Sequence, residues 1–144
     1  MSRTSATCPT ILVVDDDDGF RASLREMFEA YGYQVVEASN GREAIETASS
    51  ECPDIIIMDL NMPVMDGLNA SRQIRKEGGR CQNTPILAIS ANGLEMREVA
   101  LRAGCTDYFN KNEAVRLLMV LKDIFHNRRV KCSCGALDDA FSSD

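Results

Sequence analysis

Acidic side chains follow two apolar runs of this 144-residue chain. Residues 11–14, ILVV, lead directly into Asp15 to Asp18, and residues 54–58, DIIIM, lead into Asp59. If both runs are strands, their ends bring carboxylates together, and crowded carboxylates repel one another unless a hard divalent cation lies among them. Mg²⁺ suits such a site, because it accepts a few carboxylates, keeps waters and leaves positions for phosphoryl oxygens. A free carboxylate could then attack phosphorus as a nucleophile, and Asp59 is best placed to do so.

Phosphoryl chemistry would need two further kinds of side chain. Charge develops on the phosphoryl oxygens during transfer, so the site requires a cationic group and a hydroxyl donor. Lys111 and Ser90 supply these groups, and each follows an apolar run of its own. Alone, each would be an ordinary surface residue more often than not, so their value comes from joining the acidic residues.

Five short apolar runs alternate with amphipathic helical patterns and must position these side chains. The runs lie at 11–14, 35–36, 54–58, 86–89 and 108–109. In the first helical pattern the apolar residues recur at helical spacing, namely Phe20, Leu24, Met27, Phe28 and Tyr31. Repeated strand and helix units predict an α/β fold in which helices cover both faces of a doubly wound parallel sheet. Ligands bind outside the carboxyl ends of the strands in such sheets, where the acidic residues, Ser90 and Lys111 lie.

The length and composition fit one domain with a core of its own. Hydrophobic residues make up 44% and charged residues 26%, and no apolar run approaches the roughly 18 residues of a membrane span. The N-terminus lacks the apolar segment of a secretory signal, so we expect a cytoplasmic protein with no membrane contact. The compact domain is expected at 10–127, between a flexible N-terminus at 1–9 and a flexible tail at 128–144.

The charge and the cysteines limit the kinds of ligand and partner. A net charge of −6 opposes a general nucleic-acid surface. A local basic patch is expected to be a solvated helix face, and its members are Arg72, Arg75, Lys76 and Arg80. Three scattered cysteines are expected to be reduced, namely Cys52, Cys81 and Cys105. A zinc site at Cys132, Cys134 and His126 is disfavoured, because structural zinc sites use four ligands at tighter spacing.

Four sequence motifs occur along the chain in a fixed order. They are ILVVDDD from Ile11, DIIIMDLNMPVMDG from Asp54, PILAISAN from Pro85 and AGCTDYFNK from Ala103. Together they resemble the receiver domain of two-component response regulators, and the likeness extends over nearly the whole predicted domain. It implies a flavodoxin-like α/β fold with five parallel strands in the order 2-1-3-4-5. It also implies a phosphoprotein that catalyses only its own phosphorylation and dephosphorylation and is not otherwise an enzyme.

The resemblance also implies roles for the acidic residues. Asp59 corresponds to the phosphoacceptor and to a Mg²⁺ ligand. Asp16 would bind Mg²⁺ directly, Asp15 would bind it through a water, and the backbone carbonyl of Asn61 would be a further ligand. Asn61 and Asn92 also resemble positions that influence the water attacking the phosphoryl group, so they are expected to affect its lifetime.

The remaining site residues follow the family with one departure. Ser90 would bind a phosphoryl oxygen, Lys111 would pair with the phosphate, and Tyr108 matches an aromatic switch position, although it could simply be a half-buried core aromatic. The family usually has proline after the lysine, often with a cis bond, whereas this chain has Asn112. A cis bond without proline costs about 2.5–4 kcal/mol, so we expect a trans Lys111–Asn112 peptide and a shifted loop.

The resemblance implies two kinds of protein partner. A histidine kinase or phosphotransfer protein would donate the phosphoryl group. A downstream protein would read the surface formed by the fourth helix, the fifth strand and the fifth helix. We expect a monomer or weak dimer that does not bind nucleic acid directly.

Two other functions are compatible with parts of the pattern. Residues 16–19, DDDG, imitate the D-x-D-G motif of Mg²⁺-dependent phosphohydrolases that resemble the haloacid-dehalogenase superfamily, although that superfamily has its nucleophile on the first strand. Asp17 and Asp18 are instead expected to lie at the N-terminal end of the first helix, where acidic side chains are favourable. The other alternative is a pseudo-receiver, a scaffold that never accepts phosphate.

Overall fold

The computed structural model describes residues 8–62, 65–77, 79–91 and 95–127. The strands are β1 (Thr10–Val14), β2 (Gln34–Ala38), β3 (Ile55–Asp59), β4 (Ile86–Ser90) and β5 (Asp107–Asn110). The α-helices are α1 (Asp18–Ala30), α2 (Gly41–Glu51), α3 (Gly67–Glu77), α4 (Glu95–Arg102) and α5 (Ala114–Asn127). Two short 3-10 helices, η1 (Gly79–Cys81) and η2 (Lys111–Glu113), precede β4 and α5.

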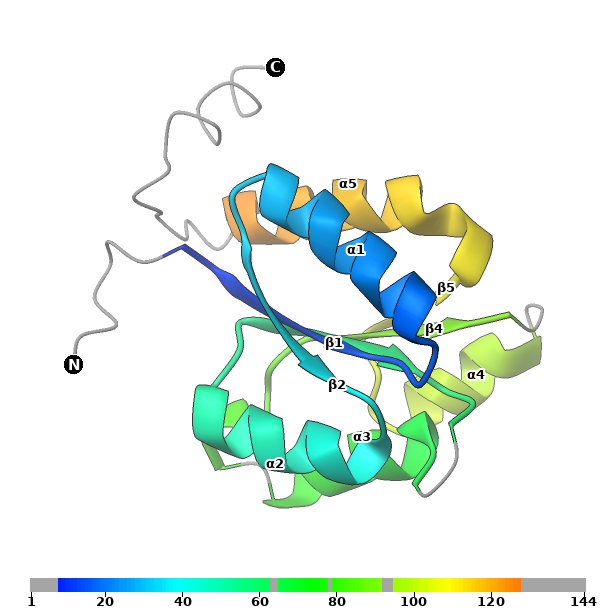
Figure 1. The fold of residues 1–144 in the computed structure, drawn as a ribbon. Coiled ribbons are helices and arrows are strands. Elements are labelled where there is room, and N and C mark those ends of the chain that lie inside the picture. The colour runs from blue at the N-terminus through cyan, green and yellow to red at the C-terminus, as the bar shows by residue number, and fades with distance from the viewer. Residues whose placement is uncertain (1–7, 63–64, 78, 92–94, 128–144) are drawn as a thin grey trace.

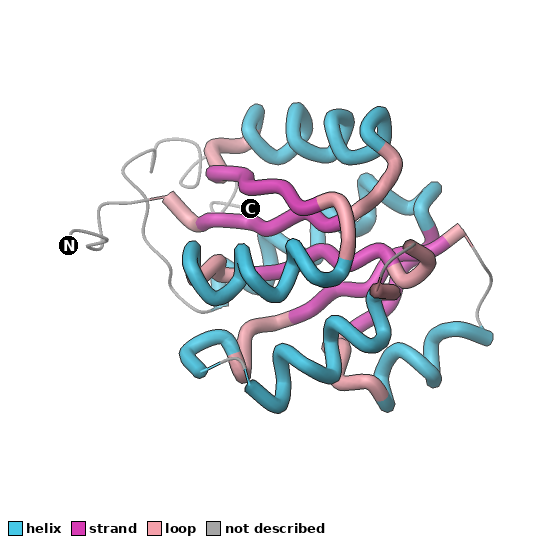
Figure 2. The backbone as a smooth tube through the Cα atoms, turned by 60° about the horizontal axis from the view of Figure 1, so that its bottom comes forward, coloured by secondary structure: helices cyan, strands magenta, loops and turns pink. Residues whose placement is uncertain are grey.

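The strands form one parallel sheet in the order β2-β1-β3-β4-β5. Helices α1 and α5 cover one face of the sheet, while α2, α3 and α4 cover the other (Figures 1 and 2). The predicted fold class and strand order are therefore confirmed. Because β1 and β3 are adjacent and parallel, their carboxyl ends meet at one edge of the sheet.

Two apolar cores, one on each face, hold the sheet between the helices. Along β1, Leu12 and Val14 pack in the core shared with α2 and α3, whereas Ile11 and Val13 pack in the core shared with α1 and α5. Successive side chains of a strand point to opposite faces, so a strand between two helical layers must be apolar at every position. All five residues of β1, β3 and β4 are buried for this reason.

Short polar side chains begin the helices that follow the strands. Asp17 is the N-cap of α1, and its carboxylate accepts from the backbone N–H groups of Gly19 and Phe20 at 3.0 and 3.2 Å. Asn40 caps α2 in the same way and accepts from Glu43 N at 2.9 Å. The predicted position of Asp17 and Asp18 at the start of the first helix is therefore confirmed.

The basic patch is only partly a solvated surface. Arg72 and Lys76 are exposed, as expected. The prediction is wrong for Arg75, whose guanidinium is half-buried and donates to the carbonyl oxygens of Gly104, Gln82 and Thr84 at 2.7–2.9 Å. These bonds connect α3 with the loops before β4 and β5, so Arg75 is a structural clamp. The side chain of Arg80 lies outside the described residues.

The described cysteines differ in their bonding. Cys52, Cys81 and Cys105 are not in disulfides, as predicted, whereas Cys8 is disulfide-bonded. The tail cysteines, Cys132 and Cys134, lie outside the described residues. None of the helices in the described ranges is long and apolar enough to cross a membrane.

Candidate functional site

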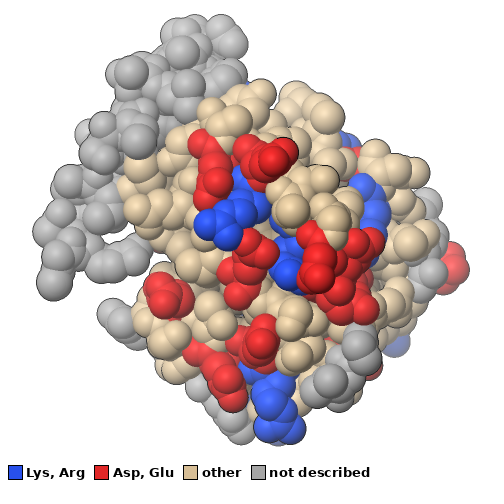
Figure 3. Space-filling view, viewed as in Figure 1, with Lys and Arg blue, Asp and Glu red and all other residues tan. Residues whose placement is uncertain are grey.

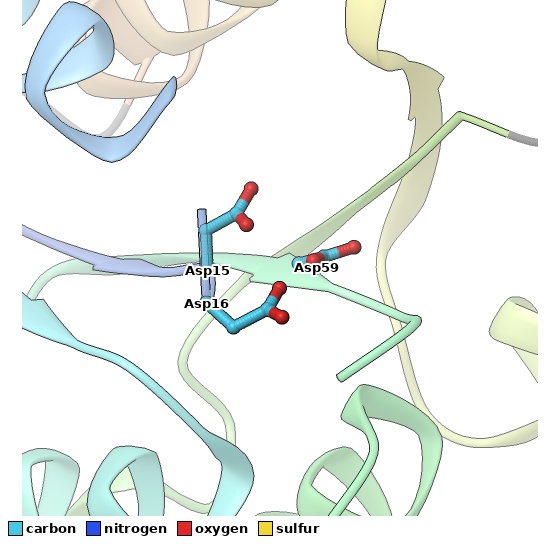
Figure 4. Close-up of side chains that lie close together, drawn as sticks. All are labelled: Asp15, Asp16 and Asp59. Atoms are coloured by element: carbon cyan, nitrogen blue, oxygen red, sulfur yellow. The ribbon is translucent and has the colours of Figure 1, made fainter. Parts of the chain in front are cut away.

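Three carboxylates meet at the carboxyl ends of β1 and β3. Asp59 is the last residue of β3, and Asp15 and Asp16 directly follow β1 (Figure 4). One oxygen from each carboxylate lies within 4.8 Å of the others. Asp15 and Asp59 are buried, with 0% and 2% exposure, while Asp16 is exposed. The structure thus brings together the three acidic residues that the sequence selected.

Lys111 lies between the two buried carboxylates. It is the first residue of η2, directly after β5, and its Nζ lies 2.8 Å from Asp15 Oδ2 and 3.6 Å from Asp59 Oδ2. The ammonium group also lies 4.8 Å from the centre of the Phe20 ring, a cation–π distance. A cation in this position offsets part of the repulsion between the two buried acids.

The surroundings of Asp59 change its protonation. Burial is the main cause that raises the pKa of Asp59 to about 7, and the neighbouring charge of Asp15 adds to it. The hydrogen bond from the Asn61 backbone N–H and the charge of Lys111 oppose this rise. Near pH 7 the carboxyl is therefore divided between protonated and ionised forms, and a bound cation would favour the ionised, nucleophilic form.

The pKa of Lys111 responds to the same neighbours. Burial lowers it, but the hydrogen bond with Asp15 and the negative charges of Asp59 and Asp15 outweigh burial and raise the pKa overall. Lys111 therefore keeps its positive charge at neutral pH, as a phosphate partner must.

The donor set fits a hard divalent cation. Asp15 Oδ2 is buried, and Lys111 Nζ lies 2.8 Å from it. One ammonium group offsets only part of the negative charge of three carboxylates, so a divalent cation among them would be favourable. Three carboxylates with one exposed member suit Mg²⁺, which binds a few carboxylates and keeps several waters.

Asn61 links Asp59 to Ser90. Its backbone N–H donates to Asp59 Oδ1 at 3.2 Å, and its side-chain Nδ2 donates to Ser90 Oγ at 3.2 Å. Ser90 ends β4 and is fully buried. The hydroxyl is thus beside the acidic residues, and its O–H can turn to donate to a phosphoryl oxygen while Oγ accepts from the amide. The role of the Asn61 carbonyl remains a prediction, and Asn92 lies outside the described residues.

Tyr108 lies deeper than expected. Its side chain is 4% exposed and belongs to the core beneath α2, α3 and α4, so Tyr108 is a core aromatic that is buried more deeply than the half-buried position expected; its role as a switch remains a prediction. The adjacent Phe109 packs in the opposite core, because successive residues of β5 face opposite sides of the sheet.

The loop after Lys111 has its own local support. The Lys111–Asn112 peptide is trans, as predicted. Asn110 caps η2 and accepts from Asn112 N at 3.1 Å, while Glu113 Oε1 accepts from Asn110 N at 2.9 Å, which completes a capping box. Proline at 112 would lack the N–H of this bond. The spacing of Asn110 and Glu113 matches the capping-box pattern, so the sequence itself carries a signal for this local support.

Two further residues hold the loops that carry the acidic side chains, and no short sequence motif marks either of them. Arg21 Nη1 donates to the backbone carbonyl of Asp15 at 2.6 Å. Gly67 begins α3 against Asp59, where a Cβ would collide with the Asp59 carbonyl oxygen. Only glycine permits this approach of the two backbones without a shift.

Comparisons with known proteins agree with this geometry. A family model described as the response regulator receiver domain matches residues 11–122. This chain belongs to that family. The receiver domain is 41% identical over 110 residues to the response regulator MprA of Mycolicibacterium vanbaalenii, an alignment that covers 76% of this chain and 46% of MprA. The chain therefore spans about half the length of this curated relative.

Solved structures show the same fold. A putative response regulator from Chloroflexus aurantiacus has a TM-score of 0.77 at 29% identity, covering 83% of this chain and 99% of that chain. The receiver domain of a sensor histidine kinase from Pseudomonas aeruginosa has a TM-score of 0.74 at 33% identity, covering 81% and 97%. That second structure has a magnesium ion coordinated in its active-site cleft.

Family membership favours one of the classes of function that the sequence left open. Receiver domains of two-component systems are typically phosphoacceptors and not enzymes, and they imply a histidine kinase as phosphodonor. The acidic cluster of this receiver domain is consistent with a Mg²⁺ site. The family match gives no support to the haloacid-dehalogenase alternative.

Proposed function

We propose that this receiver domain accepts a phosphoryl group on Asp59 in a Mg²⁺-dependent reaction. The donor is the phosphohistidine of a histidine kinase or of a phosphotransfer protein. The observation that carries the proposal is the meeting of Asp15, Asp16 and Asp59 around one point with Lys111 between the buried pair. This combination of an acidic cation site and a fixed ammonium group suits the charge of a phosphoryl group better than that of a neutral substrate.

Each residue of the site has its own role in the transfer. Asp15, Asp16 and Asp59, with the backbone carbonyl of Asn61, would hold Mg²⁺, which supplies positive charge to the phosphoryl oxygens when bound. The ionised Asp59 carboxylate attacks phosphorus and forms an O–P bond, while the P–N bond to the donor histidine breaks and its electron pair stays on the imidazole. Lys111 then pairs with the phosphoryl group of the acyl phosphate.

The signal passes through Ser90. A phosphoryl oxygen on Asp59 accepts from the Ser90 O–H, which draws the hydroxyl away from Asn61 and towards the phosphoryl group. Movement of Ser90 and of Tyr108, which pairs with Ala88 in the same β4–β5 ladder, then biases the surface of α4, β5 and α5 between two states. A downstream protein in the cytoplasm reads that surface, and the receiver domain remains a monomer or weak dimer without direct contact to nucleic acid.

Phosphorylation by a small donor tests this function. Incubation with acetyl phosphate and Mg²⁺ should add one phosphoryl group to the intact mass, and the gain should disappear with EDTA or in Asp59→Asn. Turnover of acetyl phosphate that is lost only in Asp16→Asn would instead support a hydrolase. A protein that neither acetyl phosphate nor beryllofluoride with Mg²⁺ perturbs would be a pseudo-receiver.

A further inference from the structure

Arg21 connects the acidic loop to two other parts of the domain. Its guanidinium donates to Asp15 O through Nη1 at 2.6 Å, to Glu37 Oε1 through Nε at 2.7 Å and to Asp18 Oδ1 through Nη2 at 2.6 Å. The acceptors belong to the loop after β1, to β2 and to the first turn of α1. The side chain is 15% exposed, so the bonds to Asp15 and Glu37 are partly shielded from water, whereas the bond to Asp18 is exposed.

The bond to Asp15 acts on the cation site through the backbone. The Asp15 carbonyl belongs to the peptide that joins Asp15 to Asp16, so holding it fixes the plane from which both carboxylates leave the chain. The same loop is held by the Asp15 N–H, which donates to Ala38 O at 3.1 Å, and by Asp17 N, which donates to Asp15 Oδ1 at 2.8 Å. The bond from Arg21 differs from the other two, because its donor is a side chain outside the loop. A single substitution at position 21 can therefore remove it.

We infer that Arg21 is a positioning residue for the divalent-cation site. The inference rests on the Mg²⁺ dependence in the proposed function. Arg21 touches neither a reacting atom nor a carboxylate ligand, and it acts by orienting the Asp15–Asp16 peptide. Partners that orient metal ligands in this way typically contribute 10–100-fold to metal affinity.

The positive charge of Arg21 predicts the opposite effect if charge alone matters. A guanidinium close to a cation site repels Mg²⁺, so its removal would tighten binding. In this structure Asp18 and Glu37 accept from the same guanidinium and neutralise its charge locally. Its orienting effect therefore dominates, and the two explanations differ in the sign of the change in affinity.

Arg25 is a matched control on the same helix. It pairs with Glu37 as Arg21 does, and also with Glu29 at 3.0 Å. No hydrogen bond from Arg25 reaches the Asp15 carbonyl, and its side chain is 46% exposed. Acidic and basic side chains lie side by side on the face of the molecule that carries α1 and β2 (Figure 3). Removal of Arg25 therefore changes the charge of that surface and the pairing of Glu37 while leaving the acidic loop held.

Calorimetric titration with MgCl₂ tests the inference on four folded proteins: the wild type, Arg21→Met, Arg21→Lys and Arg25→Met. We expect Arg21→Met to raise the Mg²⁺ Kd about tenfold. Arg21→Lys, which keeps the charge but lacks the planar fork, should show an intermediate increase. Arg25→Met should stay within about twofold of the wild type, as for an exposed ion pair. Circular dichroism checks that each variant is folded. If Arg21→Met does not fold, the Mg²⁺ Kd of Arg21→Lys relative to the wild type tests the positioning role instead.

Unchanged or tighter binding by Arg21→Met, or an equal loss in Arg25→Met, would overturn the positioning role. A wild type that binds no Mg²⁺ would refute both the cation site and the role of Arg21. A wild type that binds Mg²⁺ but is never phosphorylated would refute the proposed phosphoacceptor function alone, because the titration does not depend on phosphorylation.

Discussion

Asp59 is held at a cost to stability that a single substitution should reveal. In the folded chain its pKa is raised from an ordinary 3.8 to about 7, first by burial and then by the charge of Asp15. Between these values the folded state holds a proton that the unfolded state has lost, so stability is full below about pH 4 and falls as pH rises towards 7. The cost of the ionised carboxylate above pH 7 is about 4 kcal/mol.

Asp59→Asn removes this cost, because asparagine carries no charge to bury. It also loses the attraction to Lys111, so we expect the free energy of unfolding at pH 8 without metal to increase by about 2–4 kcal/mol. The advantage should shrink towards zero near pH 4, where the wild-type carboxyl is protonated in both states. Added Mg²⁺ should stabilise the wild type more than the variant, because it binds the folded carboxylates.

Urea denaturation followed by far-UV circular dichroism measures these free energies, since the chain has no tryptophan to report by fluorescence. The experiment compares both proteins in EDTA at pH 5 and pH 8, and then with MgCl₂ at pH 8. Equal stability at pH 8 in EDTA, or a less stable Asp59→Asn, would refute the reasoning. It would mean that the acidic site accommodates the charge of Asp59 without strain.

Three further substitutions test other contacts. Lys111→Met removes the cation between two buried acids. Above pH 7 without metal, it should lower the free energy of unfolding by about 2 kcal/mol, as measured by urea denaturation. An unchanged free energy would show that Lys111 does not offset the repulsion between the two acids. Arg75→Met leaves three backbone carbonyls without their donor and should lower the free energy of unfolding by about 2–4 kcal/mol in the same assay. The control Arg72→Met, on the exposed side of α3, should change that free energy by less than about 0.5 kcal/mol. Equal effects of the two substitutions would contradict the clamp role of Arg75. Glu113→Ala breaks the capping box and should lower thermal stability by about 1 kcal/mol, whereas Glu113→Gln should keep most of the wild-type stability. A similar loss in both variants would show that the carboxylate charge matters more than the hydrogen bond.

The sequence predicted the elements that position the site because the physics there is local or periodic. Unbroken apolar runs of β1 and β3 indicate strands buried on both faces, and parallel strands bring their carboxyl ends to one edge. Asp15 and Asp59 had to lie close together once that arrangement was known. The trans peptide after Lys111 was also predictable, because the cost of a cis bond without proline depends only on local chemistry.

The remaining features depend on how far long side chains reach. Arg75 was expected on a solvated face, but its guanidinium reaches carbonyls of the nearby loop before β4 and of the loop before β5, 29 residues along the chain. Arg21 likewise meets β2 and the acidic loop at once, and neither contact follows from spacing along a helix. The depth of Tyr108 depends on how α4 closes over β5, which helical periodicity does not specify.

The phosphoacceptor role is tested most directly by locating the acyl phosphate. After incubation with acetyl phosphate and Mg²⁺, borohydride reduces an aspartyl phosphate to homoserine, and peptide mass spectrometry identifies the residue that has changed. The proposed function predicts homoserine at position 59 alone, and none in protein incubated with EDTA. Modification at Asp16 with Asp59 intact, or no modification in wild-type protein that binds Mg²⁺, would contradict it.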